Sequence, residues 1–193
     1  MYVCLHCPLP MAGYSTERLI LCPYTEADLD DLMILWNDPL VRPLVVDDDI
    51  ALRGQKLKDA LHSSMERAAF GVIIRLKTTG EFMGQMMVTV DPETYEGVFG
   101  ICLSPKFWNN GYGTEATRYM VDYSFRWFDL QRMTLSVWAS NTRARAVYKK
   151  IGFKIEGRRR GSVRRSNRWE YIIRMGILYE EWAAMNSLRH RYS

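Results

Sequence analysis

A strand, a glycine turn and a long helix follow one another in the middle of the chain, and this succession constrains the fold more than any other feature. The apolar strand is Val98–Ser104, the turn contains Gly111-Tyr112-Gly113, and the helix is expected from Thr114 to about Phe128. A further strand, Met133–Ala139, follows the helix. Two strands joined through a helix run parallel in one sheet, so the sequence predicts a β-α-β crossover at the centre of the fold.

The rest of the chain adds antiparallel hairpins and further helices around this centre. Thr25 and Asp28 resemble a capping pair, and Thr78-Thr79-Gly80-Glu81 is typical of a hairpin turn. Further strands are expected at Ser15–Cys22, Phe70–Lys77, Phe82–Val90, Phe153–Gly157 and Trp169–Leu178, and further helices from Thr25 to Trp36, Asp47 to Arg67, Thr142 to Ile151 and Glu180 to Arg189. This order predicts an α/β (α+β) fold, with a mixed, mostly antiparallel central sheet of about seven strands and helices on both faces.

Length and composition favour one domain. The chain has 193 residues, of which 48% are hydrophobic, enough for one well-filled core and short for two. We therefore expect a single domain over residues 1–193, with residues 1–14 as an irregular N-terminal extension. The sequence shows neither a signal-peptide pattern nor an apolar run of the ~18 residues that a membrane span requires, so a cytoplasmic protein is expected.

The four cysteines do not predict a metal site. Cys4 and Cys7 form a lone Cys-x-x-Cys pair around His6, whereas a structural zinc site normally takes four ligands and no second pair with that spacing exists. Cys102 lies within an apolar strand pattern, which favours a small core residue over a nucleophile. No metal is expected.

The residues around the glycine turn are suited to bind an anion. Phe107–Ala116 places small residues between a strand end and the first turn of a helix, where several main-chain N–H groups have no helical partner. These donors and the positive end of the helix dipole favour a phosphate, which glycine allows to approach the main chain closely. The spacing is neither the Gly-x-Gly-x-x-Gly fingerprint nor a P-loop, so NAD and ATP are disfavoured. Glycines that serve a tight turn alone are the alternative.

Three motifs resemble the GNAT superfamily of acyl-CoA-dependent N-acyltransferases. They are Arg18-Leu19-Ile20-Leu21 with Trp36-Asn37-Asp38, the segment Phe107–Ala116, and the segment Asn141–Phe153. Their order and separation are similar to the branch that includes the bacterial ribosomal-protein alanine acetyltransferases, and in part to spermidine acetyltransferase. The resemblance implies the GNAT fold, in which two parallel strands splay apart around acetyl-CoA as the co-substrate.

The resemblance also implies roles for single residues. Transfer is expected to be direct, from acetyl-CoA to an amine in a ternary complex, without a covalent enzyme intermediate. Tyr148 is expected to protonate the departing thiolate, with a core aromatic residue as the alternative, and Asn141 to bond the pantetheine while it caps the following helix. The residues expected to bind acetyl-CoA are Ile101, Cys102, Leu103, Trp108, Asn109, Asn110, Gly111, Tyr112, Gly113, Thr114 and Asn141.

The sequence departs from the family at two places. Relatives often carry a glutamate on the strand before the loop, where this chain has Val98; Glu96 lies two residues earlier on the same strand face and is the candidate general base. A solvated charge is the alternative for Glu96, in which case a water relay or an already neutral amine is needed. Asn109-Asn110 stands where the branch has a glycine and a basic residue. Asparagine tolerates left-handed backbone angles, so the turn can form, while the lost cation weakens phosphate binding.

A cluster of arginines lies near the end of the chain and is expected between the last two strands. It contains Arg158, Arg159, Arg160, Arg164, Arg165 and Arg168. The cluster either attracts an acidic acceptor or forms a solvated hairpin, and the second interpretation is favoured because the aromatic interleaving of single-strand binders is missing. A non-catalytic acyl-CoA-binding module and a basic ribosome-associated or nucleic-acid-associated module are the functional alternatives, although we do not expect nucleic acid as a partner.

The sequence does not identify the amine acceptor. A protein N-terminus, a polyamine and a small molecule are all compatible with the family, and the protein is expected to be a monomer or homodimer.

Overall fold

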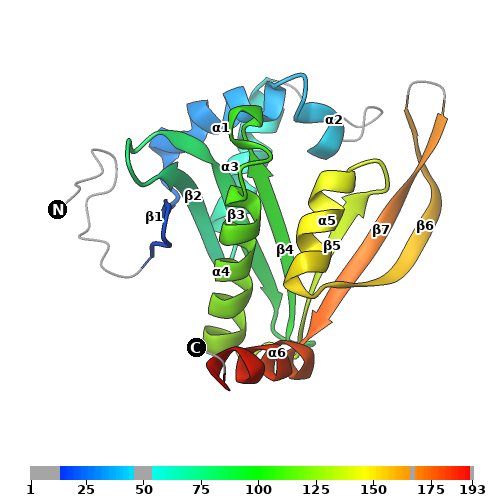
Figure 1. Ribbon diagram of the computed structural model, residues 1–193. Helices are drawn as coiled ribbons and strands as arrows, with labels where there is room; N and C mark the ends of the chain where they lie inside the picture. Colours follow the sequence, from blue (N-terminus) through cyan, green and yellow to red (C-terminus); the bar gives the residue numbers. More distant parts are fainter. Residues whose placement is uncertain (1–13, 46–53, 166–167, 192–193) are drawn as a thin grey trace. The chain divides into compact units, whose positions relative to one another are not determined.

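The computed structural model of the protein describes residues 14–45, 54–165 and 168–191 (Figure 1). Its strands are β1 Leu19–Pro23, β2 Phe70–Leu76, β3 Phe82–Asp91, β4 Glu96–Leu103, β5 Arg132–Trp138, β6 Lys154–Arg165 and β7 Arg168–Leu178. Its helices are α1 Leu29–Asn37, α2 Arg42–Val45, α3 Gln55–Glu66, α4 Tyr112–Trp127, α5 Thr142–Ile151 and α6 Tyr179–Arg191, with short 3-10 turns η1 Glu26–Asp28 and η2 Pro105–Phe107.

The strands form one mixed sheet of seven strands in the order β1-β2-β3-β4-β5-β7-β6. The pairs β1–β2, β2–β3, β5–β7 and β6–β7 are antiparallel, and β4–β5 is parallel. The predicted α/β class, mixed sheet and central crossover are therefore confirmed. Three residue pairs join the parallel strands, from Glu96–Arg132 to Val98–Thr134, although β4 continues to Leu103 and β5 to Trp138.

The chain divides into two compact units. The first unit contains the chain up to Val88 together with Gly100–Ala116, and the second contains Thr89–Phe99 and the chain from Thr117 onward. The chain therefore passes from one unit to the other within β3, within β4 and within α4. Each unit has a hydrophobic core of its own.

The core of the first unit lies among β1, β2, α1 and α3. Leu57, Leu61 and Met65 follow one another at helical spacing in α3 and are buried, because this face of the helix is apolar. They pack in one cluster with Cys22, Leu29, Leu32 and Ile73.

The predicted capping pair is confirmed at the start of η1, the 3-10 turn that leads into α1, and it has a second function. The Thr25 main-chain N–H donates to Oδ2 of Asp28 at 3.0 Å, as a capping pair requires. Oδ1 of the same buried carboxylate accepts from Nη2 of Arg75 in β2 at 2.7 Å. Because both charges are withdrawn from water, removal of either partner would leave the other uncompensated.

Strands β3 and β4 approach each other closely at Gly84. Its φ is +152°, and a Cβ atom at this position would lie 2.0 Å from the carbonyl oxygen of Cys102. No side chain fits in that space, so glycine is required here for the packing of two backbones.

The core of the second unit covers one face of β5 and β7. Side chains alternate across a strand, so the inward positions of β5 face those of β7 at matching register. The buried pairs are Met133–Ile177, Leu135–Met175 and Val137–Ile173.

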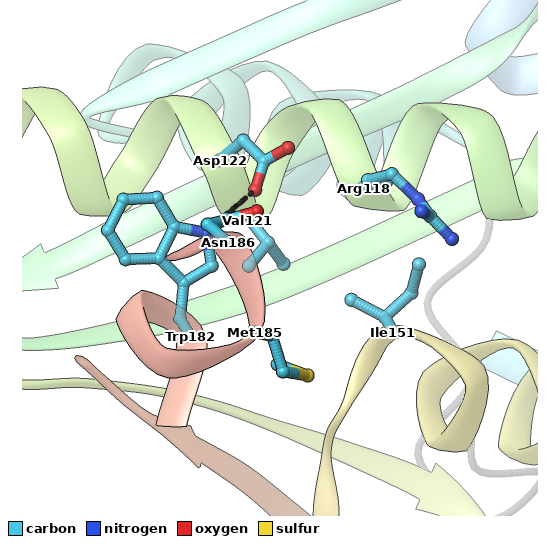
Figure 2. A pocket seen from close by; sticks show the side chains of 7 residues that line it. All are labelled: Arg118, Val121, Asp122, Ile151, Trp182, Met185 and Asn186. Carbon is cyan, nitrogen blue, oxygen red and sulfur yellow. Dashed lines mark hydrogen bonds between the residues drawn. The ribbon is translucent and has the colours of Figure 1, made fainter. Parts of the chain in front are cut away.

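Helix α6 is attached to α4 within this unit. Figure 2 shows Trp182 and Asn186 of α6 reaching the same carboxylate of Asp122. The Trp182 indole Nε1 donates to Oδ1 of Asp122 at 2.7 Å, and its ring stacks on Phe125 at 5.2 Å between centroids. A polar bond and an aromatic stack therefore fix the closing helix.

The structure corrects several element boundaries. β1 begins at Leu19 and not at Ser15. The strand expected at Phe153–Gly157 extends to Arg165, so the described arginines of the cluster lie in β6 and β7 and not between them. Helix α3 begins at Gln55 after Gly54, and the acids Asp47–Asp49 that were expected to start it lie outside the described residues. β4 begins at Glu96, two residues earlier than predicted.

Candidate functional site

The loop between β4 and α4 contains two residues with positive φ directly before the helix. Asn109 and Gly111 both adopt left-handed backbone angles, with φ of +64° and +81°. The expectation that asparagine would accept such an angle at this turn is confirmed. Left-handed residues next to a helix start turn successive main-chain N–H groups toward one side, which is typical of anion-binding loops.

The helix start leaves main-chain donors available beside this loop. The first α-helical hydrogen bond of α4 runs from the Glu115 N–H to the Gly111 carbonyl at 3.1 Å. The N–H groups of Tyr112, Gly113 and Thr114 precede it and have no helical acceptor. Three donors at the positive end of a helix of 16 residues suit a diphosphate, so the loop fits the predicted ligand.

The strand segment predicted to pair with the pantetheine arm belongs to the same unit as the loop. Ile101 and Leu103 are half-buried, and Cys102 is buried in a cluster with Leu35 and Val41. Trp108 fixes the turn after the strand, because its indole Nε1 donates to the Leu103 carbonyl at 2.8 Å. Main-chain groups of this segment are therefore held by packing on one side of the strand.

Cys102 is a core residue, as predicted. Burial, with a smaller effect from the Asp38 charge, raises the pKa of its thiol to about 12. The thiolate is the reactive form, so this group is inert at neutral pH.

This burial predicts a simple labelling result. In a Cys4→Ser/Cys7→Ser variant, the remaining thiols are Cys22 and Cys102, which are both buried and form no disulfide. We expect them to be unreactive toward 5,5′-dithiobis(2-nitrobenzoic acid) at pH 8 in the native protein and to react fully in guanidinium chloride. Rapid labelling of native protein would contradict the buried placement of these residues.

Two predicted site residues lie in the second unit: Tyr148 on α5, and Asn141 directly before that helix. The Tyr148 side chain is 7% exposed and contacts the rings of Phe99 at 6.3 Å and Phe153 at 6.0 Å, both edge to face. Phe99 directly follows the last paired residue of β4, so Tyr148 packs at the point where the parallel pairing ends. The role of its hydroxyl in catalysis stays a prediction.

Asn141 caps α5, as expected. Its Oδ1 accepts the Ala144 N–H at 3.1 Å. The preceding loop is held by Glu170 of β7, whose Oε1 accepts the Ser140 N–H at 3.1 Å and also its hydroxyl. The Asn141 amide is therefore oriented by its bond to Ala144, and the residue before it is held by Glu170.

Glu96 is engaged by polar groups of the neighbouring strands. Its Oε1 accepts from the Thr134 hydroxyl at 2.6 Å and from Nη2 of Arg174 at 2.7 Å, and Arg132 Nε lies 3.7 Å from Oε2. The Thr134 hydrogen bond, followed by the bond and charge of Arg174, outweighs burial and lowers the pKa of the Glu96 carboxyl. A general base works best with a pKa near the operating pH. The geometry therefore favours a structural carboxylate.

Two residues of the first unit that were assigned no role from the sequence contact the loop. Arg18 and Glu115 form an ion pair of 2.7 Å, and the Arg18 guanidinium also donates to the Asn110 carbonyl at 3.0 Å. An acid in the first helical turn is a signal that could have identified Glu115. Its partner is 97 residues away in the chain, and no local pattern predicts that pairing.

The Glu115 ion pair predicts a pH-dependent stability. Burial raises the pKa of the Glu115 carboxyl, but the hydrogen bonds from Thr16 and Arg18 lower it by more than burial raises it. The resulting pKa lies below the usual 4.5. A group whose pKa is lower in the folded state stabilises the fold at pH values above its pKa in the unfolded state. This stabilisation is lost as the pH falls through the pKa of the folded state. We expect Glu115→Gln to cost about 2 kcal/mol at pH 7, with the difference from wild type shrinking below about pH 4.5. Urea unfolding at pH 7 and at pH 3.5 measures the free energy of unfolding of both proteins. The same difference between variant and wild type at both pH values would contradict the ion pair.

Metal and membrane sites are not indicated by the described part of the chain. Within residues 14–45, 54–165 and 168–191, no group of three or more His, Cys, Asp or Glu side chains is placed to hold a metal ion. Cys4, His6 and Cys7 lie outside this part. None of the helices in the described ranges has the length and apolarity of a membrane span.

The chain belongs to the GNAT family of acetyltransferases. The model of the acetyltransferase (GNAT) domain matches residues 18–154, which include the glycine loop, Asn141 and Tyr148. The predicted family, enzyme class and fold are thereby confirmed, and the protein is an acetyl-CoA-dependent N-acyltransferase.

Individual relatives extend over different shares of the chain. The uncharacterized N-acetyltransferase p20 of Bacillus licheniformis is 26% identical over 90% of this chain and 99% of its own length. The L-amino acid N-acetyltransferase AaaT of Escherichia coli K12 is 32% identical, over 40% of this chain and 50% of its own. The crystal structure of spermidine N-acetyltransferase from Vibrio cholerae, in complex with CoA and spermine, superposes with a TM-score of 0.76 at 19% identity, over 87% of this chain and 99% of its own. That structure shares the fold.

Proposed function

We propose that the protein transfers the acetyl group of acetyl-CoA to a primary amine, with the loop Asn109–Thr114 as the binding site of the pyrophosphate. The conformation of this loop is the observation that carries the proposal. Asn109 and Gly111 have left-handed backbone angles there, and three main-chain N–H donors precede the first helical hydrogen bond. A diphosphate satisfies such donors better than water or a neutral ligand does.

Each remaining group of residues has a defined part in this proposal. Acetyl-CoA supplies the acyl group as a thioester, which an amine can attack without an enzyme nucleophile. The main-chain groups of Ile101, Cys102 and Leu103 hold the pantetheine arm, and the indole of Trp108 keeps that strand end in place. Asn141 Oδ1 is used by the helix cap, so its Nδ2 is the atom that we assign to the pantetheine.

Tyr148 is the residue proposed to protonate the leaving thiolate. Its ring is fixed by two edge-to-face aromatic contacts, so the hydroxyl has a defined direction. A nearby O–H donor favours departure of sulfur because it neutralises the developing negative charge.

An ammonium acceptor must lose a proton before its nitrogen can attack the thioester, and Glu96 is not suited to take that proton directly. The lowered pKa of that carboxyl and its bonds to Thr134 and Arg174 make it a weak base. We therefore propose a water relay, or an acceptor that binds as the neutral amine, and leave Glu96 the part of ordering Arg174.

The acceptor is proposed as a primary amine, and its size is left to experiment. AaaT is named for L-amino acids and the Vibrio cholerae structure for spermidine, so proteins similar to this chain act on amines of different size and charge. The expected similarity to the ribosomal-protein branch adds a peptide N-terminus to the candidates.

Two measurements test the proposal. Calorimetry with coenzyme A measures binding to the loop without any acceptor. Release of free thiol from acetyl-CoA, measured with spermidine, a panel of L-amino acids and an alanine-terminated peptide, identifies the acceptor class. Absence of coenzyme A binding would overturn the proposal, whereas binding without turnover on any amine would leave the non-catalytic acyl-CoA-binding module.

We also propose that the two units unfold together as one domain. The family match spans residues 18–154 and therefore runs through both of them. Coincident loss of far-UV and near-UV circular dichroism on heating is the expected result.

A further inference from the structure

The Glu115 carboxylate accepts hydrogen bonds from two residues that precede β1. Its Oε1 accepts the Arg18 main-chain N–H at 2.9 Å and the Thr16 hydroxyl, and its Oε2 accepts Nε of Arg18 at 2.7 Å. The carboxylate is 17% exposed. It therefore fixes the direction of the Arg18 side chain, directly before β1.

The Arg18 guanidinium lies against the loop itself. Nη1 donates to the Asn110 carbonyl at 3.0 Å, and Cζ lies 4.4 Å from the centroid of the Tyr112 ring. A Cβ atom on Gly111 would lie 3.3 Å from Nη2, tighter than an ordinary contact. The planar Arg18 guanidinium thus contacts Asn110 and Tyr112 and lies close to Gly111 between them, and its side chain remains 42% exposed.

The loop has no positive side chain of its own. Asn109–Thr114 contains neither lysine nor arginine, and asparagines stand where a basic residue is expected from the family resemblance. A diphosphate bound by main-chain donors alone would keep most of its negative charge uncompensated. Arg18 brings a permanent charge to this place from another part of the sequence.

We propose that Arg18 is a positioning residue for coenzyme A: it holds Asn110–Tyr112 in the phosphate-binding conformation and supplies the cation that the loop sequence lacks. This inference rests on the proposed function. The competing explanation is a purely structural ion pair that ties β1 to α4. If Arg18 serves the phosphates, its loss weakens only an acetyl donor that carries phosphates. If the ion pair is purely structural, its loss affects acetyl donors with and without phosphates alike.

The test compares acetyl-CoA with acetyl-pantetheine, a thioester without phosphates. For Arg18→Gln we expect KM for acetyl-CoA and Kd for coenzyme A to rise about 10-fold or more, with kcat within about 2-fold of wild type. KM for acetyl-pantetheine should not change. The matched control is Arg67→Gln, which removes an exposed arginine whose Nε donates to the Ser63 carbonyl at 3.1 Å at the end of α3. It should leave both donors unaffected.

A rescue variant tests the charge separately. Adding Asn110→Lys to Arg18→Gln returns a cation to the loop, and we expect most of the lost affinity for coenzyme A to return. Arg18→Lys, which keeps the charge but not the planar geometry, serves if Arg18→Gln does not fold, and a rise in KM smaller than about 10-fold is expected.

The outcomes separate this inference from the proposed function. Equal effects of Arg18→Gln on both donors, or wild-type affinity in that variant, would overturn the role of Arg18 while acetyl-CoA turnover by the wild type still stands. Wild-type protein that binds no coenzyme A would overturn both.

Discussion

Replacing Gly84 with alanine is expected to destabilise the protein by about 3 kcal/mol and to lower its melting temperature by roughly 6–12 °C. The added Cβ would lie 2.0 Å from the Cys102 carbonyl oxygen, and backbone atoms cannot move aside as a flexible side chain can. The strands must separate where β4 carries the segment Ile101–Leu103, so coenzyme A affinity should fall as well. Thermal unfolding and calorimetry measure the two effects.

Gly80→Ala is the matched control for this variant. Gly80 also has a positive φ, of +74°, but nothing lies within 4 Å of the position its Cβ would take. Gly80→Ala should therefore destabilise the protein only by the cost of a positive φ at alanine, about 1 kcal/mol. Equal losses in the two variants would show that the close approach of β3 and β4 does not limit position 84.

Replacing Tyr148 with phenylalanine is expected to lower kcat about 100-fold and to leave coenzyme A binding within about 2-fold of wild type. Phenylalanine retains the edge-to-face contacts with Phe99 and Phe153, so the fold should be preserved. Only the hydroxyl proposed to protonate the thiolate is lost. Steady-state kinetics with a saturating amine, together with calorimetry, give the two values.

Tyr179→Phe in the same unit is the control. Tyr179 is 44% exposed at the start of α6 and contacts Phe125 and Trp182. Removing the Tyr179 hydroxyl in this variant should not change kcat. Wild-type kcat in Tyr148→Phe would remove that residue from catalysis and leave it a core aromatic residue.

Elements with local signals could be predicted from the sequence. Helix α5 was expected at Thr142–Ile151 and has those bounds, because Asn141 caps one end and Gly152, with φ of +122°, ends the other. The start of the first helical region at Thr25 was likewise predicted from a pair of residues three positions apart.

Features that depend on pairing between distant segments could not be predicted in this way. β6 continues through an arginine-rich stretch that shows no alternation of polar and apolar residues. Its length is set instead by the register with β7, from Lys154–Gly176 to Arg165–Arg168. The loop was predicted because its glycines are a local signal. Its contact with Arg18 was not predicted, because Arg18 lies in a distant part of the sequence.

The state of Cys102 bears on side reactions of an enzyme that handles thioesters. Exchange of an acyl group between two sulfur atoms is close to balanced in energy, so a thiolate beside the pantetheine would compete with the amine and trap the acetyl group on the protein. A thiol whose pKa is about 12, enclosed with Leu35 and Val41, does not ionise at neutral pH. A sulfur atom is thereby tolerated on the proposed donor-binding strand without self-acetylation of the enzyme.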